Sequence, residues 1–220
     1  MNLKYIFFVV FIMILSCKSN DAFSLKKMTR QSRYNYISSS LKYKNGSELG
    51  NFIYHIKHSK VNLNPYNRIL IEKLNKAVFP YDIFILTELV IDEDKNKPEI
   101  ENILNAKIKI WDSGNWSEKF WELIVNYNLN VGKPKYYIFE NKSKKRYNVS
   151  EFIRSKTDSN ELGENPLLMV NWNIVSYDNG KLVITLDKLD IKQIDTTSKN
   201  ESINLYGKRG IDGFLNVTTN

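Results

Sequence analysis

The chain has 220 residues and a formal net charge of +8 at neutral pH, and 42% of its residues are hydrophobic and 13% aromatic. This composition is ample for a packed core, which excludes a fully disordered chain, and the length suits one large or two small domains. A single cysteine excludes an internal disulfide. The positive charge is compatible with nucleic acid, an anionic membrane surface or an anionic polysaccharide as partner, and equally with lysines on solvated faces.

The chain begins with the features of an export signal. Lys4 is followed by an apolar run at residues 5–15, which is too short to span a bilayer as a helix. The run ends in Ile-Leu-Ser-Cys, which resembles the signal peptide of bacterial lipoproteins. The resemblance implies a signal peptide over residues 1–16, lipidation of Cys17 and a membrane anchor, whereas the alternative is a cysteine removed with the signal. Export also excludes most nucleic-acid partners.

Residues 17–45 are predicted to form a polar tether, and residues 46–160 an α+β domain that begins with helices. Leu49, Phe52, Ile53 and Ile56 recur at helical spacing after Ser47. Further helices are expected from residue 64 up to Pro80, after Pro98 and after Asn115, because capping residues or prolines precede apolar stripes there.

Strands are predicted where β-branched and aromatic residues cluster or alternate with polar ones. Residues 83–91 predict a buried strand, and the alternation of lysine and isoleucine at residues 107–110 predicts a half-buried one. A hairpin with a basic turn at residues 142–146 is expected next, followed by a short helix capped by Ser150. The polar stretch at residues 156–165 is predicted to be a domain boundary.

Two sets of residues are candidates for a binding function. His55 and His58 would share one helix face, but no third ligand has a recognisable spacing, so we expect surface histidines and no metal. Trp111, Trp116 and Trp121 could stack on sugar rings, whereas the alternative is a core built on large aromatic side chains.

The sequence contains no recognisable catalytic pattern. Gly-x-Ser-x-Gly, His-Glu-x-x-His and a phosphate-cradling glycine loop do not occur. The acidic residues 92–94 lack the glycine and the closing glutamate of an EF-hand loop, so a solvated turn is expected. We therefore expect no catalytic residue and no cofactor, although an enzyme is not excluded.

The last part of the chain, residues 161–220, carries an ordered set of motifs. A Pro-Leu strand comes first, an Asp-Ile segment follows, and the chain closes on Leu-Tyr-Gly-Lys-Arg-Gly-Ile-Asp-Gly-Phe-Leu-Asn-Val-Thr-Thr. The residues that define the pattern are Pro166, Asp190, Ile191, Tyr206, Gly207, Arg209, Gly210 and Gly213. This pattern resembles the second half of the plug domain of TonB-dependent outer-membrane receptors, particularly those of Bacteroidetes.

The resemblance implies a plug-like β-β-α-β module and a setting in the bacterial envelope. Within this module Gly207, Gly210 and Gly213 are expected to adopt positive φ. The side chains expected to pack between helix and sheet are those of Ile191, Ile194, Ile203, Leu205 and Tyr206. The chain departs from the family at Asn171-Trp172, where the family has Asp-Gly. No receptor barrel follows, so the transport function is not expected to carry over.

Together these observations predict an α+β, lipid-anchored protein of the cell envelope, located at the outer membrane. We expect it to be non-catalytic and to bind an envelope protein or act as a scaffold through the plug-like module. The alternative is a surface lipoprotein that binds or processes glycans.

Overall fold

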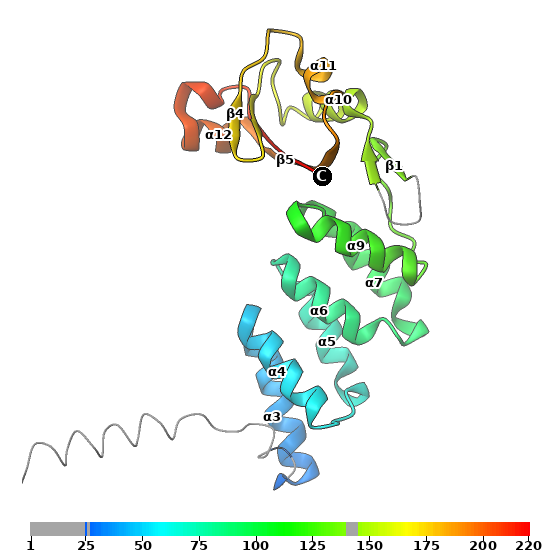
Figure 1. The fold of residues 1–220 in the computed structure, drawn as a ribbon. Helices are drawn as coiled ribbons and strands as arrows, with labels where there is room; N and C mark the ends of the chain where they lie inside the picture. The colour runs from blue at the N-terminus through cyan, green and yellow to red at the C-terminus, as the bar shows by residue number, and fades with distance from the viewer. Residues whose placement is uncertain (1–24, 26, 140–144) are drawn as a thin grey trace, which may run out of the picture. The chain divides into compact units, whose positions relative to one another are not determined.

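The computed structural model describes residue 25 and residues 27–139 and 145–220 (Figure 1). The fold is α+β, as predicted, and combines helices with a two-stranded and a four-stranded sheet. The chain divides into two compact units, of which the first comprises Met1–Ala77 and Ile85–Val90, and the second Val78–Phe84 and Ile91–Asn220. The predicted signal peptide over residues 1–16 and the lipidation of Cys17 lie outside the described residues.

The first unit is a set of helices held together by apolar contacts. Its elements are α3 (Arg30–Tyr43), α4 (Gly46–His58), the 3-10 helix η1 (Asn64–Tyr66) and α5 (Asn67–Lys76). The residues of α4 that were predicted to share one face are all buried, which confirms that helix. None of the helices in the described ranges is long and apolar enough to cross a lipid bilayer.

Helix α3 overturns the polar tether expected over residues 17–45, from Arg30 onward. Ile37 and Leu41 lie four residues apart, share one helix face and are fully buried, although the segment is rich in serine. Thr29 caps the helix because its hydroxyl accepts a hydrogen bond from the backbone N–H of Ser32 at 3.2 Å. Two buried side chains therefore help to order a segment whose composition suggests a loop.

Residues 83–91 are predicted as a buried strand, but all of them except the last belong to helix α6 (Pro80–Val90). Ile83, Leu86, Thr87 and Val90 are buried, and their spacing is that of one helix face. Pro80, expected to end the preceding helix, is the first residue of α6, where its missing N–H is tolerated. A continuous apolar run fits a buried strand and a buried helix equally well, which explains the wrong prediction.

The strand predicted at residues 107–110 is also wrong. The segment forms the short helix α8 (Ile108–Trp111), which follows η2 (Asp94–Asn96) and α7 (Lys97–Ala106) and precedes α9 (Gly114–Asn126). The indole N–H of Trp111 donates to the carbonyl oxygen of Leu104 at 2.8 Å and fastens α8 to the end of α7. Four alternating residues make only one helical turn, too few to fix a period.

The predicted hairpin is confirmed as β1 (Tyr137–Phe139) paired with β2 (Lys145–Tyr147). Of the turn predicted at residues 142–146, residues 145 and 146 belong to β2 instead, and the others lie outside the described residues. Helix α10 (Val149–Asp158) follows and is capped by Asn148 rather than by Ser150. Residues 156–165, expected as a boundary, lie within the second unit. Leu162 is buried in its core, and the N–H of Gly163 donates to the carbonyl oxygen of Asp212 at 2.8 Å.

The four-stranded sheet at the C-terminal end has the strand order β4-β3-β6-β5. Its elements are β3 (Leu167–Val170), β4 (Asn173–Val175), α11 (Leu182–Leu186), β5 (Ile191–Thr197), α12 (Lys199–Tyr206), the 3-10 helix η3 (Gly207–Gly210) and β6 (Phe214–Thr219). Strand β6 is central, parallel to β3 and antiparallel to β5.

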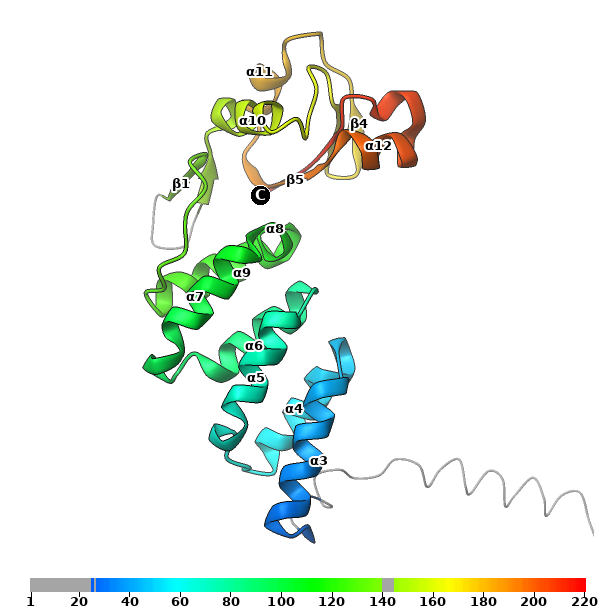
Figure 2. The ribbon, with the colours of Figure 1, turned by 180° about the vertical axis from the view of Figure 1, so that it is seen from behind.

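Helices cover the two faces of this sheet unequally. Leu215 and Val217 of β6 enter a core shared with α10 and α11, whereas Phe214 faces the opposite side, where the ring of Tyr206 from α12 lies 4.9 Å away. Helices α11 and α12 accordingly lie on opposite sides of the sheet (Figure 1, and from behind in Figure 2). Helix α12 covers the second face beside Phe214, and the β1–β2 hairpin and the start of α9 contact the edge strand β5.

Candidate functional site

Two of the three tryptophans proposed for sugar stacking are not accessible. Trp111 and Trp121 are 0% exposed, and their rings pack on each other at 5.3 Å. Trp116 is half-buried, with the ring of Phe84 at 5.7 Å and the ammonium of Lys119 at 4.8 Å from its centre. The stacking platform is therefore wrong for Trp111 and Trp121, which belong to the core.

The two histidines lie on α4, as predicted. The Nδ1 atom of His58 is 3.0 Å from the carbonyl oxygen of Tyr54, and its ring packs on that of Tyr54 at 3.9 Å. Within the described ranges no cluster of three or more His, Cys, Asp or Glu side chains could hold a metal ion. Contacts with Tyr54 of the same helix thus account for the orientation of the His58 ring.

The motif residues of residues 161–220 lie next to the strands or on the helices between them: Pro166, Asp190 and Gly213 directly precede β3, β5 and β6, Ile191 begins β5, Tyr206 ends α12, and Gly207, Arg209 and Gly210 belong to η3. Gly207 and Gly213 have positive φ, as expected, but Gly210 does not. A Cβ atom at Gly210 would lie 2.3 Å from the carbonyl oxygen of Ser202, so Gly210 is needed for a close approach to α12. The expected burial is confirmed for Ile191 and Ile194 and is wrong for Ile203 and Leu205, which are exposed, whereas the partly exposed Tyr206 contacts Phe214.

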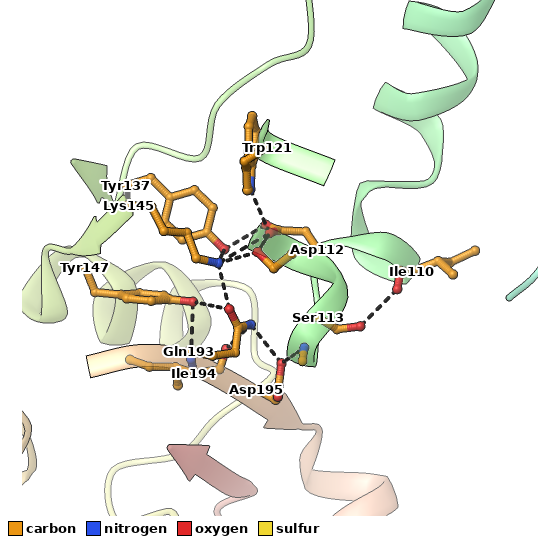
Figure 3. A network of polar contacts seen from close by, with 12 residues as sticks. Ile110, Asp112, Ser113, Trp121, Tyr137, Lys145, Tyr147, Gln193, Ile194 and Asp195 are labelled. Atoms are coloured by element: carbon orange, nitrogen blue, oxygen red, sulfur yellow. Dashed lines mark hydrogen bonds and ion pairs between the residues drawn. The ribbon is translucent and has the colours of Figure 1, made fainter. Parts of the chain in front are cut away.

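The second unit contains a polar network around the buried side chain of Lys145 (Figure 3). The Lys145 ammonium on β2 donates to Gln193 Oε1 of β5 at 2.7 Å and to the hydroxyls of Ser117 and Tyr137. The Asp112 carboxylate lies 3.7 Å from the same nitrogen, and both side chains are 6% exposed.

The Asp112 carboxylate receives several hydrogen bonds of its own. Oδ1 accepts from the hydroxyl of Ser117 at 2.5 Å and from the indole N–H of Trp121 at 2.9 Å. Oδ2 accepts from the hydroxyl of Tyr137 at 2.7 Å. The network thereby joins the helices α8 and α9, the β1–β2 hairpin and the edge strand β5, which are all parts of the second unit.

Burial and nearby carboxylates shift the pKa of Lys145 in opposite directions. Loss of solvent lowers the pKa of its ammonium to about 8, although Asp112, Asp195 and Glu118 favour the charged form. Burial and the same carboxylate of Asp112 raise the pKa of the Tyr137 phenol, which stays protonated as a donor. A lysine with a lowered pKa can act as a base or a nucleophile where a substrate can reach it.

A cavity of about 190 Å³ adjoins this network. It is lined by Gly114, Asn115, Glu118, Lys145, Lys192, Gln193, Thr218 and Asn220. An ion pair of 3.4 Å between Lys192 and Glu118 contributes to its wall. The volume is small compared with ligand pockets, which commonly span about 300–1,000 Å³.

Lys145 and Ser117 are the pair that serine–lysine hydrolases use, but their setting here does not suit that chemistry. Ser117 is 0% exposed, does not line the cavity and donates its proton to Asp112. The Lys145 ammonium has acceptors on three separate elements. The geometry therefore indicates a buried junction that fixes the hairpin and α9 on β5.

A second feature lies on the β3–β4 hairpin. Val170 pairs with Asn173, so Asn171 and Trp172 form a two-residue turn, and both have positive φ, at 46° and 69°. This is the type I′ arrangement, which favours asparagine at the first position and glycine at the second. Trp172 stands where glycine is preferred, and its side chain is 83% exposed.

The turn is held rigidly although its tryptophan has strained backbone geometry. The side-chain amide of Asn171 donates to the hydroxyl of Thr219 at 2.8 Å, and its oxygen accepts from the N–H of Thr219 at 3.1 Å. These bonds tie the turn to the central strand β6. A strained, exposed aromatic residue on a fixed turn is the kind of outlier that marks a functional position.

Strand β4 beside this turn forms an open edge of the sheet. It is hydrogen-bonded only to β3 within the described sheet. The alternation of an antiparallel pair directs the backbone N–H and C=O of Ile174 away from β3, and its side chain is 59% exposed. The other edge, β5, is approached by Tyr147, whose hydroxyl accepts from the N–H of Ile194 at 3.2 Å.

Sequence reasoning missed both features. Lys145 was placed in a basic turn, and no local signal connects it with Asp112 or Gln193. For Trp172 a signal existed, because a bulky residue occupies the second place of a predicted turn pair. Comparison of the chain with protein-family models, with curated proteins and with solved structures returned no match.

Proposed function

We propose that this chain is a lipid-anchored, non-catalytic protein of the bacterial envelope whose C-terminal module binds an extended segment of a protein partner. The single observation that carries the partner-binding role is Trp172, an exposed ring on a strained turn beside the open edge of β4. The anchor is inferred from the lipobox-like sequence before Cys17, and the outer membrane from the plug-like motifs at residues 161–220.

The chemistry of this edge favours a polypeptide strand as the partner. Ile174 offers one outward N–H and one outward C=O, which a strand of the partner can pair by β-augmentation. Trp172 and Ile174 add apolar surface beside these groups. Because β4 has only three residues, backbone pairing alone is weak, and the tryptophan ring supplies the anchor that binding sites often take from aromatic residues.

Glycan binding, the alternative, has less support. Two of its three candidate rings are buried, and Trp172 is a single exposed ring without a second one stacked beside it in the described residues. A serine–lysine hydrolase is disfavoured by the burial of Ser117.

The partner-binding proposal is tested by replacing the strained residue with one that the turn prefers. Trp172→Gly relieves the positive φ, so the free energy of unfolding is expected to rise by about 1–2 kcal/mol in a denaturant titration. A photo-crosslinking amino acid at position 174 of the full chain, expressed in its native envelope, is expected to give a discrete protease-sensitive adduct. Trp172→Gly is expected to remove this adduct although the fold becomes more stable.

A photo-crosslinker at position 184 provides the control, because Ile184 is also half-exposed but lies on α11. Equal adducts from positions 174 and 184, or an adduct that survives Trp172→Gly, would contradict the proposal. The anchor is tested separately with a radioactive fatty acid, whose incorporation Cys17→Ala is expected to abolish.

A further inference from the structure

The first unit contains a positively charged cavity that the proposed function does not use. Its volume is about 860 Å³, and it lies between the first turns of α3 and the segment from residue 60 to η1. Of the described residues that line it, three are cationic, namely Arg30, Arg33 and Lys60. No carboxylate occurs among the described lining residues, and Gln31 and Asn62 add amide groups.

The three cations are not neutralised within the described residues. No ion pair joins any of them to an Asp or Glu, in contrast to Arg68, which pairs with Glu72 at 3.1 Å. The first turn of α3 also contains no acidic residue, so the positive end of this 14-residue helix adds to their field. Such a concentration of like charge is unfavourable unless an anion joins it.

The Arg33 side chain has an unused donor at this cavity. One terminal nitrogen, Nη2, donates to the carbonyl oxygen of Met28 at 3.1 Å, which fixes the guanidinium. Its Nε atom is buried and has no hydrogen-bond partner in the part of the chain that the structure describes. Because an unsatisfied buried donor is costly, an acceptor supplied by a ligand is the expected complement.

Backbone strain and ring stacking shape the opposite wall. Lys60 has a φ of 55°, a conformation that lysine adopts only at a cost. The rings of Tyr34 and Tyr66, which also line the cavity, stack at 5.2 Å. The cavity therefore combines donors of one charge sign with an aromatic surface.

The distribution of charge along the chain also favours an anion-binding role for the first unit. Residues 27–77 contain ten Lys and Arg against two Glu, a net charge of +8, whereas residues 78–220 contain nineteen against twenty-one, a net charge of −2. The excess positive charge is thus concentrated in the part of the chain that contains this cavity. The composition alone would also allow lysines that are spread evenly along the chain and exposed to solvent, and the observed distribution differs from that.

We infer that this cavity binds a phosphate-bearing anion, with the phosphate group held by Arg30, Arg33 and Lys60. Guanidinium groups match phosphate oxygens by paired hydrogen bonds, and an ammonium adds a point charge. If Cys17 is lipidated, as the proposed function holds, only twelve residues separate it from Arg30, so the helix starts within about 45 Å of the acyl chains. This argument, which rests on the proposed function, favours an anionic lipid headgroup over a soluble phosphate.

The experiment uses the full chain purified in a nonionic detergent and labelled with ¹⁵N-arginine. Dihexanoyl phosphatidylglycerol is expected to shift the Nε–H signal of Arg33 in a saturable manner, and dihexanoyl phosphatidylcholine to leave it in place. Inorganic phosphate is titrated separately. Saturation by phosphatidylglycerol alone identifies a headgroup site, whereas equal affinity for inorganic phosphate identifies a site for soluble phosphate; either supports a phosphate-binding cavity.

Variants distinguish the cavity from general attraction to charge. Lys60→Asn keeps a residue that tolerates positive φ and is expected to weaken binding about tenfold, and Arg30→Gln should act similarly. Arg68→Gln removes the same charge outside the cavity and is expected to change the affinity less than twofold, roughly as for a screened surface charge. No shift with any ligand, or equal weakening by Arg68→Gln, would overturn the inference. Because lipidation is measured by the fatty-acid label, either result can fail independently of the other.

Discussion

The first unit carries its excess charge at the surface of a helical array, whereas the second unit buries an ion pair at the junction of its elements. In the first unit, the cavity residues Arg30, Arg33 and Lys60 have no carboxylate partner in the described residues. In the second, Lys145 and Asp112 lie 3.7 Å apart and share a network of hydrogen bonds. Cationic side chains therefore have two different roles in this protein. A cation without a carboxylate partner can bind a ligand, whereas one whose hydrogen bonds are satisfied holds helices and strands together.

Both units nevertheless use strained backbone in the same way. Five non-glycine residues in the described ranges have positive φ, and three of them are asparagines, which tolerate it. The other two are Lys60 and Trp172. Each lies in one of the two sites that we propose to bind a ligand or a partner, so stability is given up at both.

The largest expected effect tests whether the buried junction holds the second unit together. Asp112→Ala leaves the Lys145 ammonium without its carboxylate, and the free energy of unfolding is expected to fall by about 3–5 kcal/mol. Urea unfolding followed by circular dichroism measures the change. Asp94→Ala is the control, because its exposed pair with Lys97 at 3.2 Å is worth roughly 0–1 kcal/mol. Equal losses of unfolding free energy in the two variants would show that the buried ion pair contributes no more to stability than the exposed one.

The second prediction concerns the close approach at Gly210. In Gly210→Ala the new methyl group would meet the backbone of Ser202, so η3 must move away from α12. We expect a loss of about 3 kcal/mol, at the upper end for overpacked positions. Gly132→Ala should cost less than about 0.5 kcal/mol, because its Cβ would meet only Asn105 Oδ1 at an ordinary 3.4 Å. A harmless Gly210→Ala would refute the tight packing of η3.

The third prediction is a rise of stability with pH that originates in the second unit. Since burial lowers the pKa of Lys145 from 10.5 to about 8, the unfolded chain holds a proton between these values that the folded chain has lost. Unfolding then takes up a proton and becomes less favourable as the pH rises. We expect the free energy of unfolding to increase by about 2 kcal/mol between pH 8 and pH 10.

Above pH 10 the sign reverses. Burial raises the pKa of the Tyr137 phenol, so this group ionises in the unfolded chain first and favours unfolding. Lys145→Met removes the ammonium, and its unfolding free energy is expected to stay level between pH 8 and pH 10. An unchanged rise in that variant would assign the pH dependence to other groups.

The smallest expected effect is the relief of strain in the first unit. Lys60→Asn should raise the free energy of unfolding by about 1 kcal/mol, because asparagine accommodates the positive φ. Lys57→Asn, at a helical position of α4, is the comparison and is expected to be neutral or slightly destabilising. Thermal unfolding of both variants measures the difference. A destabilised Lys60→Asn would show that lysine makes contacts that offset its strain.

How far the sequence predicted the fold depended on how much periodic signal each segment contained. Helix α4 was predicted correctly because Leu49, Phe52 and Ile56 define one face. The run at residues 83–91 was apolar throughout, and residues 107–110 were too few, so both were assigned to the wrong element. At residues 161–220 the strands were located from motif spacing rather than from periodicity.

The candidate sites were less accessible to sequence reasoning because they are assembled from distant residues. Arg33 and Lys60 are 27 positions apart, and Lys145 and Gln193 are 48 apart, and no local pattern links them. Charge density along residues 27–77 could have been read from the sequence, although it does not indicate which cations converge. Trp172 was visible as an unusual turn residue, but its exposure follows only from the register of β3 and β4.

The uneven burial of the four tryptophans gives the protein an intrinsic optical probe. Trp111 and Trp121 are enclosed, Trp116 is partly covered, and Trp172 is in open solvent at the tip of its hairpin. Acrylamide should therefore quench the red-shifted part of the emission first. Binding of a partner to the β3–β4 hairpin can be followed as a blue shift of the tryptophan emission and a loss of acrylamide quenching. The measurement needs no attached dye and does not disturb the lysine-rich surface.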